Sequence, residues 1–202
     1  MTSQKRIFTL LTFSLVFLIA AGSALGQSKE LETDYEATLY VLADKADTGT
    51  AMPRSLNTVS QQIKNDLGAA NLRLINTYVS RLSTLGSVEY KGISNAYTDG
   101  PVAIGNPTFL DWRLMNMKPA EDSAGQGILK LDHFRFGARV PVRLGVRDDN
   151  DKSVSPINYE SIGLTVTRMN IREGIPTLVG TLTQPKTDGT LYLVLTVKEA
   201  SK

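Results

Sequence analysis

The stretch from Phe134 to Arg147, FRFGARVPVRLGVR, restricts the fold more than any other part of the sequence. Its even positions are all apolar, whereas its odd positions hold arginine, glycine or proline. Apolar residues at every second position are typical of a strand with one buried face. On the other face arginine recurs at every fourth residue, which is about 13 Å along an extended chain at roughly 3.3 Å per residue. We call this set the arginine row: Arg135, Arg139, Arg143 and Arg147.

Two irregularities interrupt this strand pattern. Pro141 cannot donate a hydrogen bond to a neighbouring strand, which indicates that the strand lies at a sheet edge or breaks into two. Near His133 the apolar positions change from odd to even numbers. Because such a change moves the buried side chains to the opposite face, it predicts a bulge or bend at that point.

Extended segments are predicted over most of the remaining chain, and a helix at one place. Apolar runs at 35–42, 71–85, 109–117, 128–132, 162–166, 177–183 and 190–198, with a weaker run near 88–90, indicate strands. We expect 71–85 to be covered on both faces and the last run to be a central strand. Between 53 and 67 the spacing becomes helical, with Pro53 in the first turn and Gly68 after the last periodic residue. The predicted fold class is α+β: mainly antiparallel, with roughly eight or nine strands in a sandwich-like arrangement and one helix packed near the N-terminus.

The N-terminus has the pattern of a secretory signal peptide. Lys5 and Arg6 precede an apolar run at 7–21, and small residues at Ala24 and Gly26 predict cleavage before Gln27. The sequence thus predicts a signal peptide at 1–26 and one exported domain at 27–202, with a strand-helix-strand opening over 27–85 and a β meander over 86–202. The alternative is an uncleaved anchor. No second apolar run of membrane-spanning length follows, so the cleaved protein is not expected to be an integral membrane protein.

Cysteine usage and charge limit the compartment and the partners. The chain contains no cysteine, so neither a disulfide nor a lipid-carrying cysteine is expected, and export without disulfides favours the periplasm or the exterior of a bacterium. The whole chain has 22 Lys and Arg against 20 Asp and Glu, and Lys5 and Arg6 leave with the signal peptide. The mature protein is then formally neutral, which argues against a nucleic-acid partner.

The residues that catalysis usually requires are scarce. Without cysteine and with His133 as the only histidine, a thiol nucleophile and a multi-histidine zinc site are excluded, and a catalytic triad would have to use His133. We interpret His133 as a packed, hydrogen-bonded residue. A glycosidase-type carboxylate pair stays open, because such pairs come from distant positions. We predict that the protein is not an enzyme and needs no cofactor.

One segment has part of the spacing of a calcium-binding loop. Asp149, Asp151, Ser153 and Glu160 fall at positions one, three, five and twelve of an EF-hand loop. Position six, which requires glycine, is Val154, and strands are predicted on both sides. We therefore favour an ordinary hairpin loop, with calcium binding as the alternative.

The arginine row has two interpretations. Evenly spaced guanidinium groups suit a repeating anion, such as a sulfated or phosphorylated glycan, a lipid headgroup array or an acidic protein surface. Alternatively, the arginines protect an exposed strand against edge-to-edge pairing, and acids on neighbouring strands neutralise them. We favour the second interpretation, because the mature chain is formally neutral.

Gly174 and the pair Val179-Gly180, followed by the apolar closing strand, resemble the terminal β-segments of outer-membrane secretins. The opening strand-helix-strand segment is similar to the small ring-building modules that precede those segments. The resemblance covers part of the chain and does not include the full barrel domain, so membership of the family is not inferred from it.

Three functions are compatible with these observations. We expect first a non-enzymatic interaction or assembly module of the bacterial envelope, which binds another envelope or secreted protein and adds a strand at an exposed edge. The second is a binder of anionic glycan or lipid through the arginine row. The third is an enzyme with dispersed carboxylates.

Overall fold

The computed structural model describes residues 33–44, 50–84, 86–94, 107–143, 157–183 and 189–201. The predicted signal peptide lies outside these residues. The described elements, in chain order, are β1 (Asp34–Ala43), the 3-10 turn η1 (Arg54–Leu56), α2 (Asn57–Leu67), β2 (Arg73–Ser83), β3 (Ser87–Ser94), β4 (Thr108–Glu121), β5 (Gly127–Arg143), β6 (Ile157–Arg172), β7 (Thr177–Thr183) and β8 (Thr190–Glu199).

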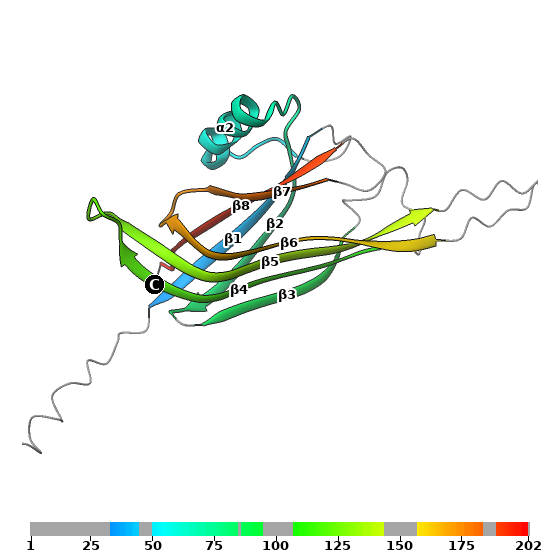
Figure 1. The fold of residues 1–202 in the computed structure, drawn as a ribbon. Helices are drawn as coiled ribbons and strands as arrows, with labels where there is room; N and C mark the ends of the chain where they lie inside the picture. The colour runs from blue at the N-terminus through cyan, green and yellow to red at the C-terminus, as the bar shows by residue number, and fades with distance from the viewer. Residues whose placement is uncertain are drawn as a thin grey trace, which may run out of the picture. The chain divides into compact units, whose positions relative to one another are not determined.

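The strands form two antiparallel sheets of four strands each (Figure 1). In sheet A the order is β2-β1-β8-β7, and in sheet B it is β3-β4-β5-β6. Strands β3 to β6 follow one another as a meander, whereas β8 returns to pair with β1. The predicted α+β class, the mainly antiparallel pairing and the central position of the last strand are confirmed. That residues 27–202 form a single domain stays a prediction.

The main core lies between the two sheets. It is built from alternate residues of β1 and β8 on one side and of β4 and β5 on the other, which is the consequence of the period-two pattern. Phe134 and Phe136 are buried in it, as predicted. Its largest fully buried side chains are Trp112, Phe134, Phe136, Leu39, Leu114, Met117, Leu129, Leu131 and Leu191.

The helix α2 packs on the outer face of sheet A. Its apolar stripe, which includes Val59 and Ile63, shares a second buried cluster with Tyr192 and Val194 of β8. Gly68 ends the helix in a left-handed conformation with φ 71°, and its N–H donates to the carbonyl oxygen of Lys64 at 3.1 Å. The predicted helix and its glycine cap are confirmed. At β1 and β8, sheet A is therefore covered on both sides, by α2 and by sheet B.

The prediction that 71–85 is covered on both faces is wrong. This segment forms β2, an edge strand of sheet A that pairs with β1 and has one isolated bridge, from Leu74 to Thr50. Thr77, Val79 and Arg81 are exposed on its outer face, and Val79 retains 58% of its accessible surface. The apolar residues on both phases indicated burial, but the helix packs nearer to β8.

The change of phase near His133 is a bend that three strands share. On β5 the inward residues change from Leu131 to Phe134, while the pairing of β5 with β4 and β6 keeps its register across the change. Asn116 on β4 and Arg168 on β6 lie at the same level with positive φ of 52° and 56°. Sheet B thus bends without the extra residue that a bulge would insert (Figure 1). Of the two predicted alternatives, a bulge or a bend, the bend is confirmed.

The prediction from Pro141 that the strand lies at a sheet edge or breaks is wrong for the strand as a whole and holds only for the end that contains Pro141. Strand β5 is an inner strand of sheet B and runs unbroken through Pro141. Its pairing with β4 ends at Phe109 and Arg139, so that Pro141 is paired with Tyr159 of β6 alone. Because β4 begins at Thr108, the missing N–H of Pro141 costs no ladder hydrogen bond on that side.

The left-handed backbone conformation of Arg168 predicts that glycine is tolerated at this position better than a β-branched residue. This conformation costs about 1 kcal/mol for a residue with a side chain and more for a β-branched residue, whereas for glycine it has no such cost. We expect Arg168→Gly to leave the free energy of unfolding within about 1 kcal/mol of the native value, and Arg168→Val to lower it by about 1–2 kcal/mol. Urea denaturation of the two variants measures the difference. Equal stability of both would show that this backbone relaxes to negative φ.

Candidate functional site: the outer face and open edge of sheet B

The outer face of sheet B brings together residues from four strands in regular rows. One row runs from Glu89 through Arg113 to Arg135, and the next joins Lys91, Asp111, Gly137 and Gly163. A third row joins Ile93, Phe109, Arg139 and Ser161. Among the described residues, the helix packs on sheet A, so this face of sheet B is accessible.

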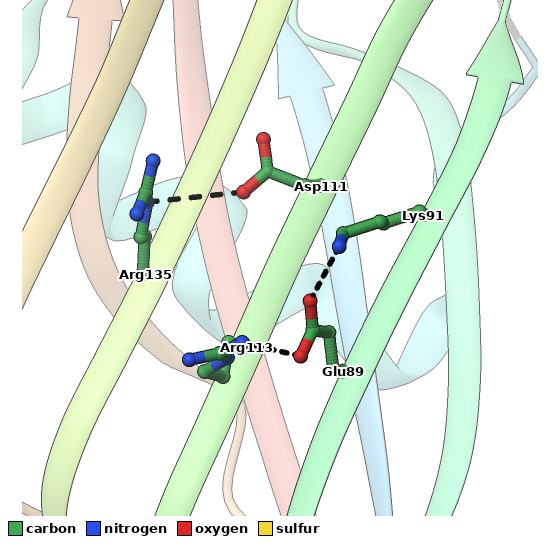
Figure 2. Close-up of polar contacts among 5 residues, drawn as sticks. All are labelled: Glu89, Lys91, Asp111, Arg113 and Arg135. Carbon is green, nitrogen blue, oxygen red and sulfur yellow. Dashed lines mark hydrogen bonds and ion pairs between the residues drawn. The ribbon is translucent and has the colours of Figure 1, made fainter.

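Most charges on this face are paired with one another (Figure 2). Glu89 lies 2.8 Å from the Lys91 ammonium and also contacts the Arg113 guanidinium, while Arg135 Nε is 3.8 Å from Asp111 Oδ2. Hydrogen bonds from Lys91 and from Arg113 hold the pKa of the Glu89 carboxyl below its usual value. Such exposed pairs contribute little to stability, but they reduce the positive charge available to a ligand.

Arg139 has a different environment. Its guanidinium carbon lies 5.9 Å from the ring centroid of Phe109 and 5.6 Å from that of Tyr159, and the two rings are 5.6 Å apart. Among the described residues, no carboxylate forms an ion pair with Arg139. A guanidinium over aromatic faces is held in place by a cation–π interaction while its charge stays available. Arg139 is thus a fixed, uncompensated cation on this face.

The structure brings two members of the arginine row to one face, Arg135 and Arg139. Arg143 is the last residue of β5 and its side chain lies outside the described part, as does Arg147. The idea that the row protects a sheet edge is wrong for Arg135 and Arg139, because both are paired with β4 on one side and β6 on the other. Neutralisation by an acid of a neighbouring strand is found for Arg135, through Asp111. Whether the row binds an anion stays a prediction.

The aromatic residues beside Arg139 were not predicted from the sequence as part of a site. Phe109 and Tyr159 are fifty positions apart in the chain and meet because β4 and β6 flank β5. The sequence contained one indication: Phe109 is two and four positions from the polar residues Asp111 and Arg113, and alternate residues of a strand lie on the same face. An aromatic residue on the polar phase of a strand indicates an exposed ring, and Phe109 is 41% exposed.

The outer face is shallowly hollowed rather than deeply pocketed. A depression of about 670 Å³ is lined by residues that include Lys91, Ile93, Phe109, Asp111 and Arg139. A second depression, of about 360 Å³, lies over the paired glycines Gly137 and Gly163. Both are open to solvent, so this face suits a flat or extended ligand better than an enclosed small molecule.

The paired glycines Gly137 and Gly163 differ in the space that they leave for a side chain. A Cβ at Gly163 would lie 2.9 Å from the backbone oxygen of Phe136, whereas a Cβ at Gly137 would meet the end of the movable Asp111 side chain. We expect Gly163→Ala to lower the free energy of unfolding by about 1–3 kcal/mol and Gly137→Ala by less than about 1 kcal/mol. Guanidinium titrations of both variants check this. The reverse order of stability would contradict the assigned close approach.

The edge strand β6 is the second accessible feature of sheet B. It has 16 residues and, among the described residues, pairs with β5 alone, while β7 belongs to the other sheet. From Ile157 to Thr167 it carries a single charged residue, Glu160. Edge strands are commonly protected by lysine, proline, bulges or short length, and this run has none of these. The edge of β6 therefore offers unpaired backbone groups to another strand.

The remaining predicted site residues are not brought together. His133 is half-buried on β5 between Met115 and Thr167 of the neighbouring strands. Of the calcium-loop residues, Glu160 is exposed on β6, while Asp149, Asp151 and Ser153 lie outside the described residues. In the part of the chain that the structure describes, no group of three or more His, Cys, Asp or Glu side chains is placed to hold a metal ion. None of the helices in that part has the length and apolarity to cross a membrane.

Comparisons with known proteins give matches among solved structures. No family model and no curated protein matches the sequence. Among solved structures, the chain is similar to the InvG secretin domain β-barrel from the Salmonella SPI-1 injectisome, at 12% identity and a TM-score of 0.32 over 94% of this chain and 68% of that one. The cryo-EM structure of the same Salmonella secretin gives 11% and 0.29 over 94% and 70%, and its open-gate state gives 13% and 0.34 over 94% and 66%. Because identity and TM-score are both low, neither family membership nor function follows from this likeness.

Proposed function

We propose that the protein is a non-enzymatic interaction module of the bacterial envelope that binds a partner protein by strand addition at the edge of β6. The observation that carries this proposal is the long, nearly uncharged edge of β6, which has a paired strand on one side only. In strand addition the backbone hydrogen bonds supply affinity, and alternate side chains supply specificity.

The other edge strands are less suited to such a contact. Strand β3 has 8 residues and carries Glu89 and Lys91, and β7 has 7 residues, with a register shift between Leu178 and Gly180 where it pairs with β8. Strand β2 has 11 residues and an exposed arginine, Arg81. Shortness, charge and irregularity are the features that protect an edge from pairing. β6 is the longest of the four, and its flat part from Ile157 to Thr167 has one charged residue, Glu160.

The envelope location in this proposal is supported by the signal-peptide pattern of residues 1–26 and by the lack of cysteine. The shallow outer face of sheet B also suits contact with a protein surface. On this proposal the mature chain is exported, remains folded through its two clusters of buried apolar residues, and acts without a cofactor.

Site-specific photo-crosslinking in the producing cell tests the proposed contact. A photoreactive residue at Thr165, which is exposed on β6, is compared with one at Gln61, which is exposed on α2. We expect a discrete protein adduct from position 165 and none from position 61. Adducts of equal yield from both positions, or none from position 165, would count against strand addition at β6.

A second function, binding of an anionic glycan or lipid on the outer face of sheet B, is favoured by the uncompensated charge of Arg139. If it holds, Arg139→Gln is expected to weaken binding to heparin or to vesicles with anionic headgroups about tenfold, since one charge-assisted contact is lost. Arg113→Gln is the matched control, because Arg113 already pairs with Glu89. Binding should also fall steeply with salt. Equal effects of both substitutions, or insensitivity to salt, would exclude this function.

A further inference from the structure

Strand β6 has an approximate two-fold symmetry of residue type about Leu164. Of the first four pairs of residues equally distant from Leu164, three are similar or complementary in type. The matched pairs are Ile162 with Val166, Ser161 with Thr167, and Glu160 with Arg168, whereas Gly163 and Thr165 differ. When two identical strands pair antiparallel, residues that are equally distant from the centre lie opposite each other.

We propose that the strand added at β6 is β6 of a second copy of this chain, paired antiparallel with Leu164 opposite Leu164. This inference rests on the proposed function and names its partner. The two copies of sheet B, four strands each, would join into one continuous sheet related by a two-fold axis perpendicular to it. Their outer faces, with Arg139 on each, would lie on the same side of that sheet.

The alternation of side chains fits this register. Ile162, Leu164 and Val166 lie on the inner phase of β6 and are half-buried in the single chain. In the pair, these residues would contact their counterparts and bury part of their remaining apolar surface. Ser161 and Thr167 would face each other on the outer phase. Shifting the pairing by one residue would place apolar side chains opposite outward polar ones, so one-residue shifts are excluded.

Charge selects among the remaining registers. Glu160 and Arg168 are both exposed, and neither forms an ion pair among the described residues. With Leu164 at the centre, each Glu160 lies opposite Arg168 of the other copy, so two ion pairs frame the apolar residues. A shift by two residues would place Glu160 opposite a residue other than Arg168. Arg168 also ends the flat part of the edge, because the bend of sheet B begins there.

Charge reversal in solution tests the pairing. Sedimentation velocity of the protein over a concentration series is expected to show a monomer–dimer equilibrium, because a contact of one strand pair is small. Glu160→Arg or Arg168→Glu would place like charges opposite each other at both ends, so each is expected to weaken dimerisation about tenfold. The double variant Glu160→Arg with Arg168→Glu is expected to restore it. A merely structural effect of either residue would not be rescued in this way.

The outcomes separate this inference from the proposed function. A native protein that stays monomeric at all concentrations, or a dimer that the single variants leave unchanged, would overturn self-pairing about Leu164. An adduct at position 165 that contains a different protein would then still support strand addition. If a single variant fails to fold, hydrogen exchange of the native protein decides instead. Its β6 amides are expected to become more protected as concentration rises, and constant exchange would overturn the inference.

Discussion

Replacing Trp112 with alanine is expected to lower the free energy of unfolding by about 3–5 kcal/mol, because it leaves a large cavity between the two sheets. Trp112 lies on β4 with 1% of its surface exposed, in the same cluster as Phe134 and Phe136 of β5. The cluster joins both sheets, so its loss should lower the stability of the whole fold. Urea denaturation followed by circular dichroism measures the change.

Trp112→Phe is the matched variant. The indole Nε1 is buried and has no hydrogen-bond acceptor among the described residues. Phenylalanine removes this unpaired donor and fills most of the volume, so we expect a loss below about 1.5 kcal/mol. A loss as large as that of alanine would show that the N–H has a partner or that the ring shape is essential.

The parts of the fold that follow from local spacing could be predicted from the sequence. The alternation around Phe134 and Phe136 gave the inward face of β5, and the change of phase near His133 gave the bend. The helical spacing and Gly68 gave α2 and its end. In each case the deciding interaction lies within one turn or one strand, so the sequence contains the whole signal.

The position of a strand within its sheet could not be predicted in the same way. Pro141 suggested an edge, yet β5 is an inner strand, because the end of β4 determines which backbone groups need a partner there. The run at 71–85 suggested a covered strand, yet Val79 is exposed at the edge of sheet A. Both outcomes depend on residues distant in the chain, which periodicity does not report.

In the candidate site, too, the features set by local spacing could be predicted and those set by neighbouring strands could not. That Arg135 and Arg139 share a face followed from their spacing. Their different environments did not, because Asp111 comes from β4 and Tyr159 from β6. The symmetry of β6 about Leu164 is present in the sequence, but it acquires meaning only once β6 is known to be an open edge.

Ile63→Ala in α2 is expected to lower the free energy of unfolding by about 2–5 kcal/mol. Ile63 is fully buried, and its cluster includes Leu42 of β1 and Tyr192 of β8, so its truncation leaves a cavity between the helix and sheet A. An isolated helix of 11 residues is marginal in water, and tertiary packing must hold α2 in place. Asn65→Ala, at an exposed position of the same helix, is the control and should change stability by less than about 0.5 kcal/mol. If α2 and sheet A form one cooperative unit, Ile63→Ala will shift a single urea transition. A separate early transition of the helix would contradict that coupling.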